Sequence, residues 1–289
     1  MNAINKISFK QKMKNYAKHP GSLIIMILVC LAALISVAVL VTIIGYVLIR
    51  GIPHLSASLF AWKYTSENVS MMPAIVNTVT MTVLSLLFAV PIGIFSAIYL
   101  VEYAKKGNKL VSAVRLTTET LSGIPSIVYG LFGYLMFNQA LGWGYSMLGG
   151  ALTLAIMILP LVMRTTEEAL LAVPDSYREG SFGLGAGRLR TVFRIVLPSA
   201  IPGILSGVIL SIGRIVGETA ALIYTSGSVT GIPKNVMGSG RTLAIHMYAL
   251  FSEGLHMDEA YATGVVLLVL VLAINGLSSL IAKKLEKKQ

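Results

Sequence analysis

The sequence predicts an all-α membrane protein with six transmembrane helices. Of its 289 residues, 55% are hydrophobic and only 12% are charged, whereas soluble domains carry about 25% charged residues. Six apolar runs reach the roughly 20 residues that a helix needs to cross a bilayer. They lie at Ser22–Ile49, Ile75–Val101, Leu121–Leu141, Gly144–Met163, Ile201–Thr225 and Ala260–Ala282.

The first apolar run is expected to stay in the mature protein. It is too long for a signal peptide and lacks a small-residue cleavage site. Residues 1–50 are therefore expected to form a cytoplasmic tail and the first transmembrane helix. Residues 51–289 are expected to form a core of five transmembrane helices with a long cytoplasmic loop at 164–198. The single cysteine, Cys30, excludes a disulfide within the chain.

The distribution of basic residues predicts the orientation. Eighteen of the 23 lysines and arginines flank the runs on one side, four lie on the other side, and Arg214 lies inside a run. By the positive-inside rule, both termini are cytoplasmic. The basic residues behind the net charge of +11 are therefore interpreted as determinants of membrane orientation. They form no patches interleaved with stacking aromatics, so we expect no nucleic-acid partner. The cytoplasmic set is Lys6, Lys10, Lys12, Lys14, Lys18, Lys105, Lys106, Lys109, Arg115, Arg164, Arg178, Arg188, Arg190, Arg194, Lys283, Lys284, Lys287 and Lys288.

The runs and loops contain residues open to two interpretations. Pro91, Pro125 and Pro160 interrupt runs two, three and four, where each removes a backbone hydrogen bond. They serve either packing geometry or hinges in a moving bundle. The histidines are dispersed without metal-ligand spacing, so we expect solvated side chains and no metal site. They are His19, His54, His246 and His256.

Local signals in the cytoplasmic loop predict a short helix from Tyr177 to Leu184. Ser176 and Glu179 have the spacing of a capping box, in which each side chain satisfies a free amide at the helix start. Gly185 suits a left-handed helix end. A helix of two turns does not persist alone in water, so something must hold it.

Two surroundings are possible for this helix. It is small in the middle, with aromatic and aliphatic side chains projecting, which suits insertion into a cleft of another protein. Arginines that follow it could instead anchor an amphipathic connector on the bilayer. Physical reasoning alone leaves both open. The projecting residues are Tyr177, Phe182 and Leu184, and the arginines are Arg188, Arg190 and Arg194.

The fifth run contains two charges, Arg214 and Glu218. Arg214 is predicted to lie about 20 Å from the cytoplasmic end of this run, and Glu218 one turn further on the same face. A charge at this depth costs at least about 2.5 kcal/mol, so it should face protein or water. The two residues form either an ion pair that locks the bundle or a substrate path. In the second case Arg214 meets a passing oxyanion, which arginine suits through bidentate contacts with phosphate.

The cytoplasmic loop carries a motif with fixed spacing. Glu179-Gly180-Ser181, three residues, Gly185, nine residues and Ile195-Val196-Leu197-Pro198 follow one another. This pattern resembles the EAA motif of ABC-importer permeases, with Gly180 and Ser181 in place of the two alanines. The resemblance implies a type I ABC importer permease fold with a coupling helix docked on a cytoplasmic ATPase. The implied coupling residues are Ser176, Glu179, Gly180, Ser181, Gly185, Ile195, Leu197 and Pro198.

The ATP-binding machinery is expected on a separate subunit. No G-x-x-x-x-G-K-[ST] sequence occurs in the chain, and that loop cradles the phosphates of ATP. We therefore expect a transport subunit without enzymatic activity or cofactor of its own.

Three shorter sequence segments indicate which ABC-importer permeases the chain resembles. Ser122–Gly130 and Gly217–Ala221 look like the permeases of phosphate-specific ABC importers, and Thr242–Glu253 looks more like the PstA subunit than its PstC partner. The resemblance implies a bacterial cytoplasmic membrane, a PstC-like second permease, PstB-like ATPases and an external PstS-like phosphate-binding protein. Permeases for sulfate, molybdate or phosphonate remain an alternative. A secondary transporter driven by protons through Glu218 is disfavoured by the missing inverted repeat.

Overall fold

A computed structural model describes residues 20–105 and 107–286. Every regular element within these residues is helical. Internal contacts divide the chain into one unit of residues 1–50 and a second of residues 51–289. Several residues of the predicted cytoplasmic flanks lie outside the described residues, namely Lys6, Lys10, Lys12, Lys14, Lys18, His19, Lys106, Lys287 and Lys288.

Five helical segments in the described residues are long and apolar enough to cross a membrane. A sixth is added if one bent pair of helices counts as a single span. The five segments are carried by α2 (Pro20–Gly51), α3 (Met72–Ile98), α6 (Met147–Leu171), α9 (Leu197–Val216) and α12 (Met257–Glu286). The bent pair consists of α4 (Lys109–Ser122) and α5 (Ser126–Gly133), and α5 continues as a π-helix over Tyr134–Ala140.

The straight third span predicted over residues 121–141 is wrong at its beginning. Leu121 and Ser122 end α4, and the chain then bends by 104° before α5 begins at Ser126. Pro125 lies at this bend in an extended conformation. It lacks an N–H group and disfavours a helical residue before it, which explains the break. Pro91 and Pro160, in contrast, lie inside α3 and α6.

The fifth predicted span also differs from the structure, at both ends. Its helical course begins at Arg188, with α8 (Arg188–Thr191) and a π-helical turn (Val192–Val196) leading into α9. It breaks after Val216, and α10 (Ala220–Thr225) follows as a separate short helix. The remaining elements are two 3₁₀ turns (Ile52–His54 and Ala57–Phe60), a π-helical turn after α3 (Tyr99–Tyr103), α7 (Asp175–Gly183) and α11 (Leu243–Glu253).

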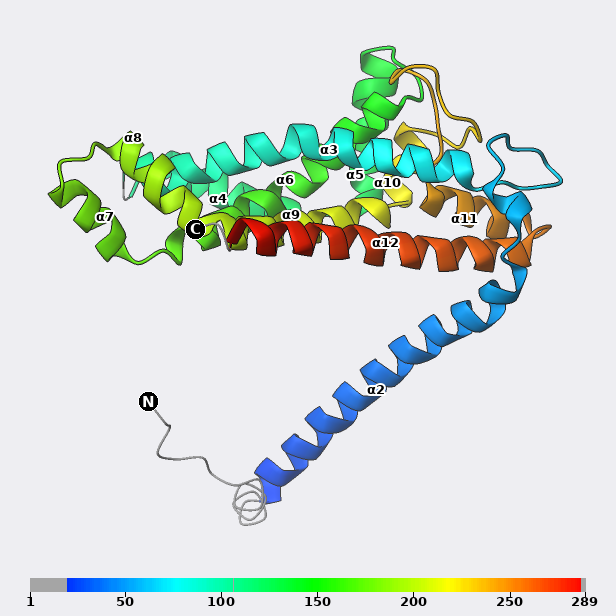
Figure 1. Cartoon of the computed structure of the whole chain (residues 1–289), viewed down its shortest axis with the longest axis horizontal. Helices are drawn as coiled ribbons and strands as arrows, with labels where there is room; N and C mark the ends of the chain where they lie inside the picture. The colour runs from blue at the N-terminus through cyan, green and yellow to red at the C-terminus, as the bar shows by residue number, and fades with distance from the viewer. Residues whose placement is uncertain (1–19, 106, 287–289) are drawn as a thin grey trace. The chain divides into compact units, whose positions relative to one another are not determined.

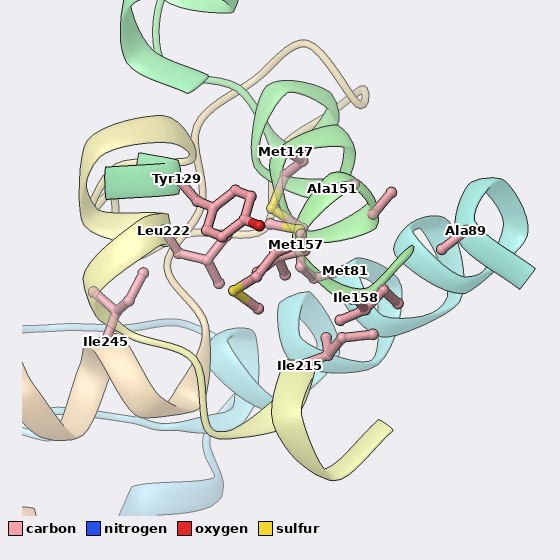
Figure 2. Close-up of a cluster of buried hydrophobic side chains, with 12 residues drawn as sticks. Met81, Ala89, Tyr129, Met147, Ala151, Met157, Ile158, Ile215, Leu222 and Ile245 are labelled. Atoms are coloured by element: carbon pink, nitrogen blue, oxygen red, sulfur yellow. The ribbon is translucent and has the colours of Figure 1, made fainter. Parts of the chain in front are cut away.

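The core of the second unit lies where α3, α6, α9 and α10 meet. Figure 1 shows α12 running alongside α9, with α7 and α8 at one end of this unit and α11 at the other. Buried side chains from six helices contact one another in the core, and Figure 2 shows Tyr129 and Leu222 facing Met157 there. The short helix α10 is therefore held in the core despite its length.

Glycines allow α9 to approach α6 closely. A Cβ atom at Gly203 would overlap Ala169, and one at Gly207 would overlap Thr165. Small residues four apart in a helix permit such a close approach of two backbones. Gly213 and Gly217 contact no neighbouring helix.

Gly207→Ala should lower the melting temperature of the purified protein in detergent. The added methyl group has no space beside Thr165, and overpacking costs about 1–3 kcal/mol. Gly276→Ala on α12 is the matched control, because nothing lies within 4 Å of that position. It should leave stability unchanged or raise it, and equal melting temperatures of the two variants would contradict the packing assigned to Gly207.

Candidate substrate path and coupling helix

A cavity of ≈ 630 Å³ lies between α4, α6 and the end of α9. Its walls combine apolar residues with three arginines and three glutamates. The charged residues are Arg115, Glu119, Arg164, Glu167, Glu168 and Arg214. The polar helix α4 contributes two of them, and the apolar runs of the sequence gave no indication that this helix lines the cavity.

Arg214 lies level with the middle of α6. Gly203 of α9 lies against Ala169 of α6, and Gly207, one turn later in α9, lies against Thr165, one turn earlier in α6. The two helices are therefore antiparallel, and later turns of α9 lie against earlier turns of α6. Arg214 accordingly lines the cavity together with Pro160 and Leu161. Its expected depth therefore agrees with the structure, but Arg214 lies in the last turn of α9 and not inside a continuing helix.

Arg214 is the arginine of this cavity that has no carboxylate partner among the described residues. Arg115 contacts Glu167, and Arg164 Nε donates to Glu168 Oε1 over 3.0 Å. Arg214 is half-buried and forms no ion pair with a described residue. The open space beside Gly213 leaves room next to it. A guanidinium without an ion-pair partner among the described residues therefore faces the cavity, whose wall also holds Glu119.

The first of the two alternatives, an ion pair between Arg214 and Glu218, is not formed among the described residues. Glu218 lies in the break between α9 and α10, so it does not continue the helical face of Arg214. Its carboxylate instead accepts a hydrogen bond from the backbone N–H of Ala221 over 3.1 Å. Side chains that accept from free amides in this way stabilise helix starts. Glu218 therefore caps α10, and the two charged residues serve different helices.

Two of the sequence segments that resemble phosphate-importer permeases, Ser122–Gly130 and Gly217–Ala221, lie close together in the fold. A Cβ atom at Gly130 on α5 would overlap the backbone of Ala221 and approach that of Ala220. Ser122, from the first of these segments, lines the cavity together with Arg214. The segments at 122–130 and 217–221 thus contact each other at Gly130 and Ala221, although about 90 residues of sequence separate them.

The short helix of the cytoplasmic loop is present as α7, but it begins at Asp175 instead of Tyr177. The predicted capping box does not form, because Ser176 lies inside the helix and no side chain caps its start. Pro174 precedes α7 directly, and a proline needs no partner for an N–H group. The side chains of Ser176 and Glu179 are exposed.

The end of α7 agrees with the expectation for Gly185. This glycine has φ of +82°, a left-handed conformation that costs other residues about 1–2 kcal/mol. The N–H of Gly185 donates to the carbonyl of Phe182 over 2.9 Å, and that of Ala186 donates to Ser181 over 3.1 Å. These two bonds form a Schellman motif, which ends the helix sharply.

The motif residues divide between an exposed and an inward side. Leu184 is 91% exposed, and Tyr177 and Phe182 are 52% and 47% exposed, so α7 presents apolar side chains that the described residues cover only in part. Ser181 is buried and shares a hydrogen bond of 2.8 Å with Thr191. The remaining motif residues Ile195, Leu197 and Pro198 are half-buried and lie in the helical course toward α9.

The expectation that the side chain of His246 is solvated is wrong, because this residue is buried. It lies on α11, outside the membrane-length helices. Burial, reinforced by the positive charge of Arg241, lowers the pKa of His246 to about 3. Its imidazole therefore stays uncharged at neutral pH.

Membrane-length helices around a charged cavity, with a short exposed helix in one connecting loop, define this chain as a helical membrane permease. The chain belongs to the family described as binding-protein-dependent transport system inner membrane component, whose model matches residues 89–289.

Relatives are similar over most of the chain. The probable ABC transporter permease protein YqgI of Bacillus subtilis (strain 168) is 36% identical over 277 residues, which cover 88% of this chain and 94% of that protein. The phosphate transport system permease protein PstA of Pasteurella multocida (strain Pm70) is 38% identical over 231 residues, covering 78% and 82%. PstA 1 of Mycobacterium tuberculosis (strain CDC 1551 / Oshkosh) is 36% identical over 205 residues, covering 70% and 67%.

Solved structures show the same fold. A chain of the inward-facing MetNI methionine ABC transporter matches with a TM-score of 0.63 at 22% identity, covering 77% of this chain and 99% of that one. A chain of a bacterial ABC transporter for alginate import matches with a TM-score of 0.58 at 19% identity, covering 87% and 95%. The chain thus has the type I ABC importer permease fold.

Glu218→Gln should leave the melting temperature of the purified protein nearly unchanged, because glutamine still offers an oxygen to Ala221 N–H. Glu218→Ala should lose the cap, a loss of about 1 kcal/mol. If Glu218 instead neutralised Arg214, both substitutions would leave a buried charge unpaired and cost about 3–5 kcal/mol. A large and equal loss in the two variants would therefore contradict the capping role.

Proposed function

We propose that this chain is the PstA-like permease subunit of an ATP-driven ABC importer of inorganic phosphate. The observation that carries the proposal is the guanidinium of Arg214, which forms no ion pair with a described residue, at the wall of a cavity in the helical core. Relatives named as phosphate transport permeases support phosphate as the cargo. This chain would form half of the translocation path of the importer.

Arg214 would act by hydrogen bonding to the oxyanion while the oxyanion loses its hydration water. A guanidinium presents paired N–H donors that match phosphate oxygens. The neighbouring arginines of the cavity are already paired with Glu167 and Glu168, so they add little net positive charge. Passage requires binding that is favourable enough to enter and weak enough to leave, and a single free arginine meets both conditions.

The exposed apolar side of α7 supports an ATPase partner. Tyr177, Phe182 and Leu184 project from this helix, as insertion of a helix into a hydrophobic groove requires. We propose that a PstB-like ATPase receives α7 and binds the ATP. A PstC-like permease would form the other half of the path, and an external PstS-like protein would deliver phosphate and supply most of the selectivity.

The proposed orientation puts both termini and α7 in the cytoplasm. The excess of lysine and arginine on that side of the sequence supports it. In this orientation the subunit is a multi-pass protein of the bacterial cytoplasmic membrane, with lipid around its apolar helices.

A different oxyanion is the second candidate cargo, because a guanidinium binds sulfate, molybdate or phosphonate by the same contacts. A proton-coupled mechanism gains no support from the charged residues: Glu218 caps α10, and His246 stays uncharged. Competition for uptake by each oxyanion distinguishes the cargoes. Copurification of an ATPase with this chain supports the importer, whereas phosphate transport by the chain alone in liposomes contradicts it.

Arg214→Gln should reduce uptake of radiolabelled phosphate by the assembled importer by at least about tenfold, because a lost charged hydrogen bond is worth about 1.5–3 kcal/mol. Arg214→Lys should retain part of the uptake, since it keeps the charge but not the forked donors. Assembly is checked by the amount of ATPase that copurifies. Normal uptake by a fully assembled Arg214→Gln importer would show that this residue is structural.

Gly185→Ala should decrease the phosphate moved per ATP hydrolysed, because alanine strains the left-handed end of α7 by about 1–2 kcal/mol. Gly187→Ala is the matched control: it is equally uncrowded, but its φ of −74° suits alanine. Uptake and ATP hydrolysis are measured together in proteoliposomes. The docking role of α7 loses its support if the two variants couple equally well.

A further inference from the structure

Arg178 fastens α7 to the end of α3. Its Nη2 and Nε groups both donate to Oε1 of Glu102, over 2.7 Å and 3.1 Å. Glu102 lies in the π-helical turn that follows α3 (Tyr99–Tyr103) and is 76 residues away in sequence. The motif of the loop gives no indication of this partner.

The same guanidinium also closes the end of α6. Its Nη1 donates to the carbonyl of Val173 over 2.8 Å, and its Nη2 donates to that of Leu170 over 2.9 Å. Carbonyls at a helix end lack partners within the helix, and an arginine satisfies them well. One side chain on α7 therefore joins the ends of two membrane-length helices.

Burial makes the contact with Glu102 strong. The side chain of Glu102 is 8% exposed and that of Arg178 is 15% exposed. Charges in such surroundings are poorly screened, and removal of one partner leaves the other charge uncompensated. Arg178 Nη1 also lies 3.2 Å from Asp175 Oδ1, but Asp175 is 87% exposed. Exposed pairs of this kind contribute little.

A second contact joins the loop to the same place. The guanidinium of Arg188, at the start of α8, lies 5.7 Å from the centre of the Tyr103 ring, within cation–π distance. Ser181 on α7 is hydrogen-bonded to Thr191 of α8. Both α7 and α8 are thereby tied to the end of α3.

We propose that Arg178 and Glu102 are the positioning residues that pass movement of α7 to the substrate cavity. Covalent connection through residues 172–174 alone would let this short helix swivel, whereas the Arg178 contacts oblige the ends of α3 and α6 to follow it. Those ends line the cavity: Leu100 precedes Glu102 by two residues, and Leu171 follows Leu170. This inference rests on the proposed function, because it requires an ATPase that moves α7.

The test compares Glu102→Gln with Asp175→Asn in the complete importer. Each substitution removes one negative charge from the surroundings of Arg178, but only the first removes the buried partner. Uptake of labelled phosphate and ATP hydrolysis stimulated by loaded binding protein are measured in the same proteoliposomes. Glu102→Gln should hydrolyse ATP yet move at least about fivefold less phosphate per ATP, the lower range of coupling between sites. Asp175→Asn should match the unsubstituted importer.

A conservative variant covers the case in which Glu102→Gln fails to assemble. Glu102→Asp keeps the charge, and its shorter side chain should give a coupling ratio between the other two. A merely structural role would lower the amount of complex and reduce uptake and hydrolysis in proportion, with no change in phosphate per ATP.

Spin labels report on the contact independently of transport. In a Cys30→Ala background, cysteines introduced at Lys105 and Gly183 place one label after α3 and one on α7. Their distance distribution should stay narrow in the unsubstituted chain and broaden with Glu102→Gln, but not with Asp175→Asn.

The outcomes separate the two proposals. An unsubstituted importer that moves phosphate, together with a Glu102→Gln variant of equal coupling ratio and narrow distances, overturns the role of Arg178 and leaves phosphate import intact. An unsubstituted complex that moves no phosphate contradicts the proposed function, and with it the coupling role, even where the labels confirm the contact itself.

Discussion

The close contact between α9 and α6 determines where the functional residues lie. Gly203 and Gly207 let the two backbones meet at Ala169 and Thr165, and this crossing places Arg214 opposite the middle of α6. The same crossing leaves one face of α6 for α4, so that the cavity forms between them. Larger residues at the two glycines would separate the helices and move the guanidinium away from its wall.

Hydropathy predicted most of the membrane-length helices because burial in lipid requires long apolar runs whatever the tertiary contacts. It failed where a helix breaks inside an apolar run. The bend before Ser126 and the interruption after Val216 both lie within runs that are apolar on average, so hydropathy averaged over a window does not reveal them, although the second break contains the charged Glu218. Pro125 and Gly217 were visible in the sequence, but a proline or glycine alone does not distinguish a kinked helix from a broken one.

The candidate site was predictable where the signal is local. The left-handed Gly185 follows from the chemistry of helix ends, and the depth of Arg214 follows from counting along a helix. Partnerships across the sequence were not predictable. Nothing near Arg178 points to Glu102, and nothing near Glu218 shows that the helix has ended before it. The capping box at Ser176 failed for a related reason, since a plausible local pattern gave way to a helix that begins directly after Pro174.

The break after Val216 also creates two helix ends with opposite electrical character. Aligned peptide dipoles give the last turn of α9 a partial negative charge of about half an electron, and Arg214 lies in that last turn. The first turn of α10 offers free amides, which the carboxylate of Glu218 occupies. An anion arriving at Arg214 must therefore share the guanidinium with a helix that already attracts it. If Arg214 receives the cargo as proposed, this competition would weaken retention of the anion and favour its rapid onward passage.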